Sequence, residues 1–203
     1  MAMTDHFVPI YYATRDGQSR RIAAHIGAYL ALAGVRTSLS VAGSPPSAEE
    51  FEGYPLVVLI AAVRYGRHLA EANLFLAGYR ALSRPPPLAL ASVNLTARKA
   101  DKRTAEANPY LSKWLRREKI SPVLATAFAG RLDYPLYRRC DRLAIRLIML
   151  LTGGETDPTA TVEYTSWRDV DAFAEAIAAS LRVSDNGGRV ARPGTTPDSA
   201  EIS

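Results

Sequence analysis

The segment Thr14–Ser19, with the sequence TRDGQS, contains the residue types of an anion-binding site. The apolar segment Phe7–Ala13 precedes it, and apolar residues at helical spacing follow it. A helix start has unpaired N–H groups and a partial positive charge, so a phosphate can bind there. Thr14 and Ser19 can donate hydroxyl hydrogen bonds, and Gly17 lets the backbone approach a ligand closely. The segment has neither the P-loop nor the dinucleotide fingerprint, and by itself it also fits an ordinary strand–helix turn with polar capping residues.

Two later loops carry groups that suit a flat heterocyclic ligand, and each follows an apolar segment. They comprise Arg64, Tyr65 and Gly66, and Ser92, Val93, Asn94 and Leu95. The Tyr65 ring can stack on a planar ring. The second of these loops offers backbone N–H and C=O groups and the Asn94 amide to a polar ring edge. Considered singly, Tyr65 also fits a packing residue and Asn94 a turn residue.

Alternating strand and helix patterns indicate how these loops are positioned. Strands are predicted over Phe7–Ala13, Arg36–Ala42, Leu56–Ala61, Leu88–Val93 and Val123–Ala129, and helices over Ser19–Ala33, Leu69–Leu82 and Trp167–Leu181. This order is typical of a doubly wound α/β fold with a five-stranded parallel sheet. The three loops follow the first, third and fourth strands, so we expect them to meet in one crevice and to form a flavin site. Pro9 lies inside the first strand and lacks an N–H donor, which predicts that pairing starts only at Ile10.

Several motifs, taken in order, carry a more specific likeness. They are TRDGQ at 14–18, IAAVRYG at 60–66, SVNLTARK at 92–99, KRT at 102–104, YPLYR at 134–138 and GGETD at 153–157. Together they resemble the flavodoxin-like, quinone-dependent protoporphyrinogen IX dehydrogenases of bacterial haem synthesis. The resemblance runs from about Ile10 to Ala179, and the chain departs from the pattern at Pro9, in the residues before the first strand and after Val183.

The resemblance implies FMN as the cofactor. The residues expected to bind it are Thr14, Arg15, Asp16, Gly17, Gln18, Ser19, Arg64, Tyr65, Gly66, Ser92, Val93, Asn94 and Leu95. The first six would surround the phosphate, with Asp16 pointing away from it and accepting N–H hydrogen bonds at the helix start. Tyr65 would cover the flavin ring, and Asn94 with its neighbours would bind the pyrimidine edge. The implied reaction is the oxidation of protoporphyrinogen IX to protoporphyrin IX in three two-electron steps, with menaquinone or ubiquinone as acceptor; no catalytic acid or base is predicted.

A basic region points to an anionic partner. Between Arg98 and Arg146 the chain has thirteen Lys/Arg against five Asp/Glu. Part of this region is an insertion after the fifth strand, residues 130–157, which contains a basic amphipathic helical pattern. The arginines of that pattern are Arg138, Arg139, Arg142 and Arg146. Such a helix suits an anionic membrane surface or an apolar substrate with carboxylates, although it also fits a helix that packs on the domain with its arginines in water.

The chain is predicted to form one domain, residues 1–183, followed by a disordered tail, residues 184–203, rich in Gly, Pro, Ser and Asp. Its single cysteine excludes an internal disulfide and favours a reducing compartment. Three scattered histidines indicate no metal site. No secretory signal and no membrane span is predicted, so we expect peripheral binding to the cytoplasmic side of the inner membrane.

Three other functions fit parts of the pattern. A flavodoxin-type electron carrier would have the same loops and is the main alternative, although such carriers are typically acidic and this chain has a net charge of +5. An FMN reductase that uses a nicotinamide cofactor would need a second nucleotide motif, which is not visible. A membrane-binding or nucleic-acid-binding module would leave the three ligand loops without a role. The sequence therefore favours the dehydrogenase, with no nucleic-acid partner.

Overall fold

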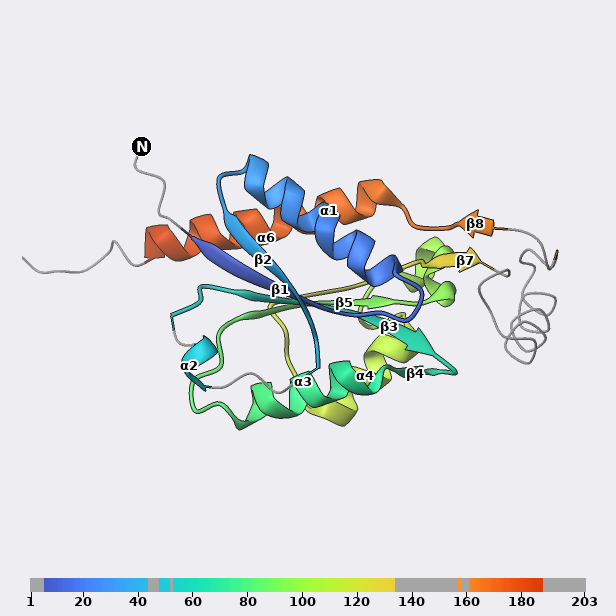
Figure 1. Cartoon of the computed structure of the whole chain (residues 1–203), viewed down its shortest axis with the longest axis horizontal. Coiled ribbons are helices and arrows are strands. Elements are labelled where there is room, and N and C mark those ends of the chain that lie inside the picture. The colour runs from blue at the N-terminus through green and yellow to red at the C-terminus, as the bar shows by residue number, and fades with distance from the viewer. Residues whose placement is uncertain (1–5, 44–47, 52, 134–156, 158–160, 188–203) are drawn as a thin grey trace, which may run out of the picture.

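The computed structural model describes residues 6–43, 48–51, 53–133, 157 and 161–187. Its centre is a parallel sheet with the strand order β2-β1-β3-β5-β6 (Figure 1). The strands of this sheet are β1 (Phe7–Ala13), β2 (Arg36–Val41), β3 (Val57–Arg64), β5 (Leu88–Val93) and β6 (Leu124–Phe128). The predicted five-stranded, doubly wound parallel sheet is therefore confirmed, and β3 extends three residues beyond its predicted end.

Helices cover both faces of the sheet (Figure 1). One face carries α1 (Gln18–Leu32) and α6 (Trp167–Gly187), and the other carries α3 (Ala70–Ala81) and α4 (Pro109–Glu118). The shorter elements are α2 (Ala48–Phe51), β4 (Arg67–His68), β7 (Arg131–Asp133), β8 (Thr161–Glu163) and the 3-10 helices η1 (Leu95–Arg98) and η2 (Ala100–Lys102). Among the described residues, no helix has the length and apolar character needed to cross a bilayer.

The central strand β3 shows why its sequence is an apolar run and not an alternating one. Val58 and Ile60 belong to the core under α1 and α6, whereas Val57, Leu59 and Ala61 belong to the core over α3 and α4. All five side chains are fully buried. Successive side chains of a strand point to opposite faces, so a strand that is covered on both faces needs an apolar residue at every position.

Pro9 is accommodated by the hydrogen-bond alternation of β1. The carbonyls of His6 and Tyr12 accept hydrogen bonds from the chain at β2, so the even-numbered residues of β1 face that strand. Pro9 therefore directs its nitrogen towards β3, where pairing begins only at Ile10. The predicted start of pairing is confirmed on the β3 side, but on the β2 side pairing already includes residues 7–9.

Two regions differ from the sequence prediction. Helix α6 continues to Gly187, so the segment predicted as a tail begins with a further helical turn; residues 188–203 lie outside the described residues. Strand β7, at the start of the predicted insertion, pairs antiparallel with β8, which lies just after its predicted end; this pair was not predicted. Residues 134–156, which contain Arg138, Arg139, Arg142 and Arg146 and the predicted inserted helix, lie outside the described residues.

Candidate functional site

The three predicted loops meet at the carboxyl ends of β1, β3 and β5. The strand register brings these ends to one level, because Ala13 pairs with Ala61 and Ala62 pairs with Val93. The loops line one cavity of about 600 Å³. Thr14, Asp16, Gln18 and Ser19 line it from the first loop, residues 62–66 from the second and residues 93–96 from the third. Of the other predicted ligands, Arg15, Gly17 and Ser92 do not line this cavity.

The start of α1 has the features of an anion-binding site. Gly17 precedes the helix with a φ of +82°, a left-handed conformation that favours glycine, and no side chain caps the helix. The Ser19 hydroxyl is fully buried, lines the cavity and has no hydrogen-bond partner among the described residues. An unpaired buried hydroxyl costs free energy, whereas a phosphate on the helix start would accept its hydrogen bond. The residues at this end of the cavity therefore fit a phosphate group.

Asp16 is paired across the cavity wall with Arg64. Its two carboxylate oxygens accept hydrogen bonds from Arg64 Nη1 at 2.9 and 3.2 Å. This contact differs from the N–H hydrogen bonds that the sequence predicts for Asp16. The Arg64 guanidinium carbon also lies 5.4 Å from the centroid of the Tyr65 ring. The ion pair ties the first loop to the second and offsets the negative charge of Asp16 beside the phosphate end.

Tyr65 and Gly66 form the two-residue turn between β3 and β4. Arg64 pairs with Arg67 across this turn, and the φ angles of Tyr65 and Gly66 are +50° and +74°. Two successive positive φ angles are the signature of the hairpin turn that suits glycine or asparagine, and a bulky side chain there is strained. Tyr65 nevertheless lines the cavity and is 71% exposed as a residue. Strain at an exposed ring makes Tyr65 a candidate functional residue.

The Asn94 side chain is used inside the protein. It exchanges hydrogen bonds with the Asn108 amide at 3.1 and 3.3 Å, and it caps η1 by accepting from the Ala97 N–H. Asn108 in turn caps α4 by accepting from the N–H groups of Tyr110 and Leu111. The Asn94 side-chain amide therefore already has hydrogen-bond partners inside the protein, while Asn94 also lines the cavity together with Val93, Leu95 and Thr96.

Ser92 lies behind the third loop and binds a buried histidine. Its hydroxyl is 2.8 Å from His68 Nε2, and the His68 ring stacks on Trp114 with 3.7 Å between the centroids. Burial, with a smaller contribution from the Arg117 charge, lowers the pKa of His68 to about 3. The imidazole is therefore neutral near pH 7, and it supports the loop without lining the cavity.

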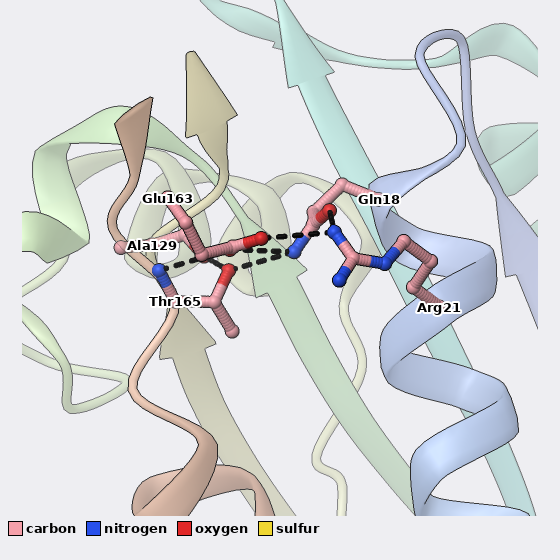
Figure 2. A network of polar contacts seen from close by, with 5 residues as sticks. All are labelled: Gln18, Arg21, Ala129, Glu163 and Thr165. Atoms are coloured by element: carbon pink, nitrogen blue, oxygen red, sulfur yellow. Dashed lines mark hydrogen bonds and ion pairs between the residues drawn. The ribbon is translucent and has the colours of Figure 1, made fainter. Parts of the chain in front are cut away.

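Gln18 links the first loop to the stem of the insertion (Figure 2). Its Nε2 donates to Glu163 Oε1 at 2.8 Å and to Thr165 Oγ1 at 2.9 Å, and its Oε1 accepts from Arg21 at 3.0 Å. Arg21 also pairs with Glu163 at 2.9 Å, and Thr165 Oγ1 donates to the Ala129 carbonyl at 2.8 Å. Figure 2 shows these contacts spanning the space between α1 and the chain after β8. We call Gln18, Arg21, Glu163 and Thr165 the Gln18 latch.

Sequence reasoning missed part of the cavity lining. The additional charged and aromatic side chains are those of Arg98, Lys99, Lys102, Tyr110 and Arg131. Three of them lie within motifs that carried the family resemblance, and that was the available signal. Tyr110 depends on α4, which the sequence analysis did not predict although Asn108 and Pro109 form a typical cap and first helical residue.

A second cavity, of about 830 Å³, lies beside β6, α4 and α6. An ion pair of 2.7 Å between Arg103 and Asp169 lines it, and none of the three loops contributes to it. It is larger but lies away from the carboxyl ends of β1, β3 and β5, where ligands of this fold class bind. Within the described part of the chain, no cluster of side chains could hold a metal ion.

The fold and the loops correspond to a known class of protein. Residues 9–159 match the family model described as a flavodoxin domain. Among solved structures, a short-chain flavodoxin associated with a bacterial microcompartment has a TM-score of 0.51 and 12% identity, over 87% of this chain and 99% of that chain. At this identity the likeness shows the fold alone.

Relatives with higher sequence identity assign the chain to a narrower class of protein. Protoporphyrinogen IX dehydrogenase (quinone) of Escherichia coli (strain K12) is 38% identical over 169 residues, which cover 83% of this chain and 93% of the relative. A protein of the same name from Leishmania major is 44% identical over 126 residues, which cover 62% of this chain and 54% of the relative. The chain therefore belongs to the flavodoxin domain family, in the branch that contains these dehydrogenases.

Proposed function

We propose that this protein oxidises protoporphyrinogen IX to protoporphyrin IX and passes the electrons to a quinone. The 38% identity to a dehydrogenase of that name, over 93% of its length, is the observation that carries the proposal. The convergence of three ligand loops on one cavity supports it. The overall reaction removes six electrons and six protons from the porphyrinogen, so three quinones are reduced to quinols for each porphyrin formed.

FMN is the proposed cofactor, and the described residues fit it. The start of α1 and the unpaired Ser19 hydroxyl would hold the phosphate, with Thr14 beside them. The Tyr65 ring would cover the flavin, and the backbone of residues 93–96 would bind its polar edge. Bound FMN supplies the two-electron chemistry.

In this proposal, the protein's own residues bind the cofactor and the substrate and orient them. Among the described side chains that line the cavity, none is a histidine or a cysteine, and the one carboxylate, Asp16, is paired with Arg64. No cavity side chain is therefore proposed as a catalytic acid or base. The Asp16–Arg64 pair fixes the first two loops relative to each other, which positions the phosphate end of the cavity and the Tyr65 ring together.

Membrane attachment is proposed from the sequence of the insertion. Arg138, Arg139, Arg142 and Arg146 recur on an apolar pattern that suits an anionic bilayer surface, from which a lipid-soluble quinone is reached. We place the protein peripherally on the cytoplasmic side of the inner membrane. Menaquinone and ubiquinone both fit this proposal.

An anaerobic reduction experiment tests the function. The FMN-loaded protein is mixed with protoporphyrinogen IX, and flavin absorbance and porphyrin fluorescence are followed. We expect the oxidised flavin absorbance to bleach as porphyrin forms, and to return when a quinone is added. The FMN-free protein is the control. A flavin that is reduced by a chemical reductant but never by porphyrinogen would support the electron-carrier alternative.

A further inference from the structure

We propose that Lys99 and Lys102 form a subsite that binds the carboxylates of the substrate, at the β5 side of the cavity. The inference rests on the proposed function and deepens it, because it assigns residues to substrate recognition. Both lysines line the same cavity as the three ligand loops. Neither belongs to the phosphate end at the start of α1.

Both ammonium groups are available to a ligand. Lys99 is exposed and has no ion-pair partner among the described residues. Lys102 lies 3.3 Å from Asp101, in a pair whose side chains are 39% and 69% exposed. An ion pair this open to water is weak, so a ligand carboxylate can displace it at little cost.

The backbone that carries the lysines is held firmly. Asn94 caps η1, which Lys99 follows, and the Asn108 amide donates to the Lys102 carbonyl at 2.9 Å. The two asparagines bind each other and are nearly fully buried. Because this amide pair connects η1, η2 and α4, the backbone positions of Lys99 and Lys102 are set before a ligand arrives.

A cofactor phosphate does not account for these charges. Strand β3 lies between β1 and β5, so the loop after β5 is two strand spacings, about 9.5 Å, from the phosphate loop. Arg98 and Arg131 add positive charge to the cavity lining, whereas its one described acidic residue, Asp16, is paired with Arg64. Among the described lining residues outside the phosphate loop, positive side chains therefore predominate, which suits a second anion.

The aromatic and cationic side chains that line the cavity indicate which class of ligand would bind there. Tyr65 and Tyr110 both line the cavity, and the two-residue turn of the first approaches the ring of the second, since a Cβ at Gly66 would lie 3.8 Å from Tyr110 Cε1. Aromatic surface in a cavity that two lysines also line suits an apolar ring system with carboxylate side chains. A porphyrinogen with two propionates has this character. A quinone carries no charge, so the lysines distinguish the electron donor from the electron acceptor.

Binding of the reaction product tests the subsite directly. Protoporphyrin IX and its dimethyl ester are titrated into the FMN-loaded protein, for wild type, Lys99→Met, Lys102→Met and the double variant. Lys113→Met is the matched control, because Lys113 is exposed on α4 and does not line the cavity. We expect each cavity substitution to weaken binding of the free acid about tenfold. The ester should bind all variants alike, and FMN affinity should not change.

The outcomes separate the subsite from the proposed function. Equal binding of the free acid to wild type and to the double variant would overturn the subsite, as would a loss of FMN affinity in the lysine variants. Turnover should show a higher KM for porphyrinogen in the double variant and an unchanged KM for quinone. If wild type fails to oxidise porphyrinogen yet binds the free acid through the lysines, the proposed function is wrong and the subsite stands.

Discussion

Tyr65 holds a bulky ring on a left-handed backbone, and this conflict predicts opposite effects on stability and on binding. Tyr65→Gly should raise the free energy of unfolding of the FMN-free protein by about 1 kcal/mol, because glycine tolerates the φ of +50°. The same change should weaken FMN binding by about 1–2 kcal/mol through lost stacking. Denaturant unfolding and flavin titration measure the two effects. Tyr65→Phe, which keeps the ring, should change neither by much; a Gly variant with unchanged FMN affinity would contradict the stacking role.

At the level of elements, the Gln18 latch should stabilise the insertion stem, which is the β7–β8 pair, because it ties this pair to the start of α1. Gln18→Leu removes the donor to Glu163 and Thr165 and leaves the buried Thr165 oxygen less well paired, which should cost about 1–3 kcal/mol of unfolding free energy. Hydrogen exchange at the β7–β8 amides should accelerate more than exchange in β3. Arg20→Ala, an exposed substitution on the same helix, is the control. Uniform acceleration across the sheet would show that the latch does not act on the stem.

The elements also show what the sequence could predict. Strands such as β5 were located because a strand buried on both faces is apolar throughout, and the loops followed from the strand ends. From the sequence, residues that would contact a cofactor could be distinguished only partly from residues that hold the structure together. Gln18 and Asn94 have polar groups at the expected positions, but their hydrogen bonds go to Glu163 and Asn108, 145 and 14 residues away along the chain. A single sequence does not reveal such partners, because they depend on tertiary packing.

At the scale of the whole molecule, the lowered pKa of His68 predicts that the folded protein loses stability in mild acid. Its folded pKa of about 3 lies below the unfolded value of 6.5, so the unfolded chain takes up the proton first. The contribution to stability is complete above pH 6.5 and is lost as the pH falls towards 3, by up to about 1.4 kcal/mol for each pH unit. Denaturant unfolding between pH 7 and pH 4 measures this slope. His68→Gln should flatten it; equal slopes in both proteins would assign the acid sensitivity to other groups.

The insertion can be removed at a place that the structure defines. Asp133 pairs with Thr161 at the end of β7 and β8, so a two-residue Asn-Gly turn can replace residues 134–160 and close the hairpin. The described residues that line the cavity and the Gln18 latch lie outside this segment, so the shortened protein should bind FMN with unchanged affinity. It should lose binding to anionic vesicles and most quinone-dependent turnover, because the deletion removes the arginine-rich pattern from 138 to 146.

Vesicle sedimentation at low and high salt and steady-state turnover with porphyrinogen and quinone check these two losses separately. The full-length protein with Arg138, Arg142 and Arg146 changed to Gln is the matched control, since it keeps the segment and removes three charges. If the charges act at the membrane, this control should lose the salt-sensitive part of vesicle binding and keep turnover with a water-soluble quinone. If they hold substrate, it should raise the KM for porphyrinogen with either quinone. Full turnover in the shortened protein would leave recognition of the substrate to the cavity and its lysines alone.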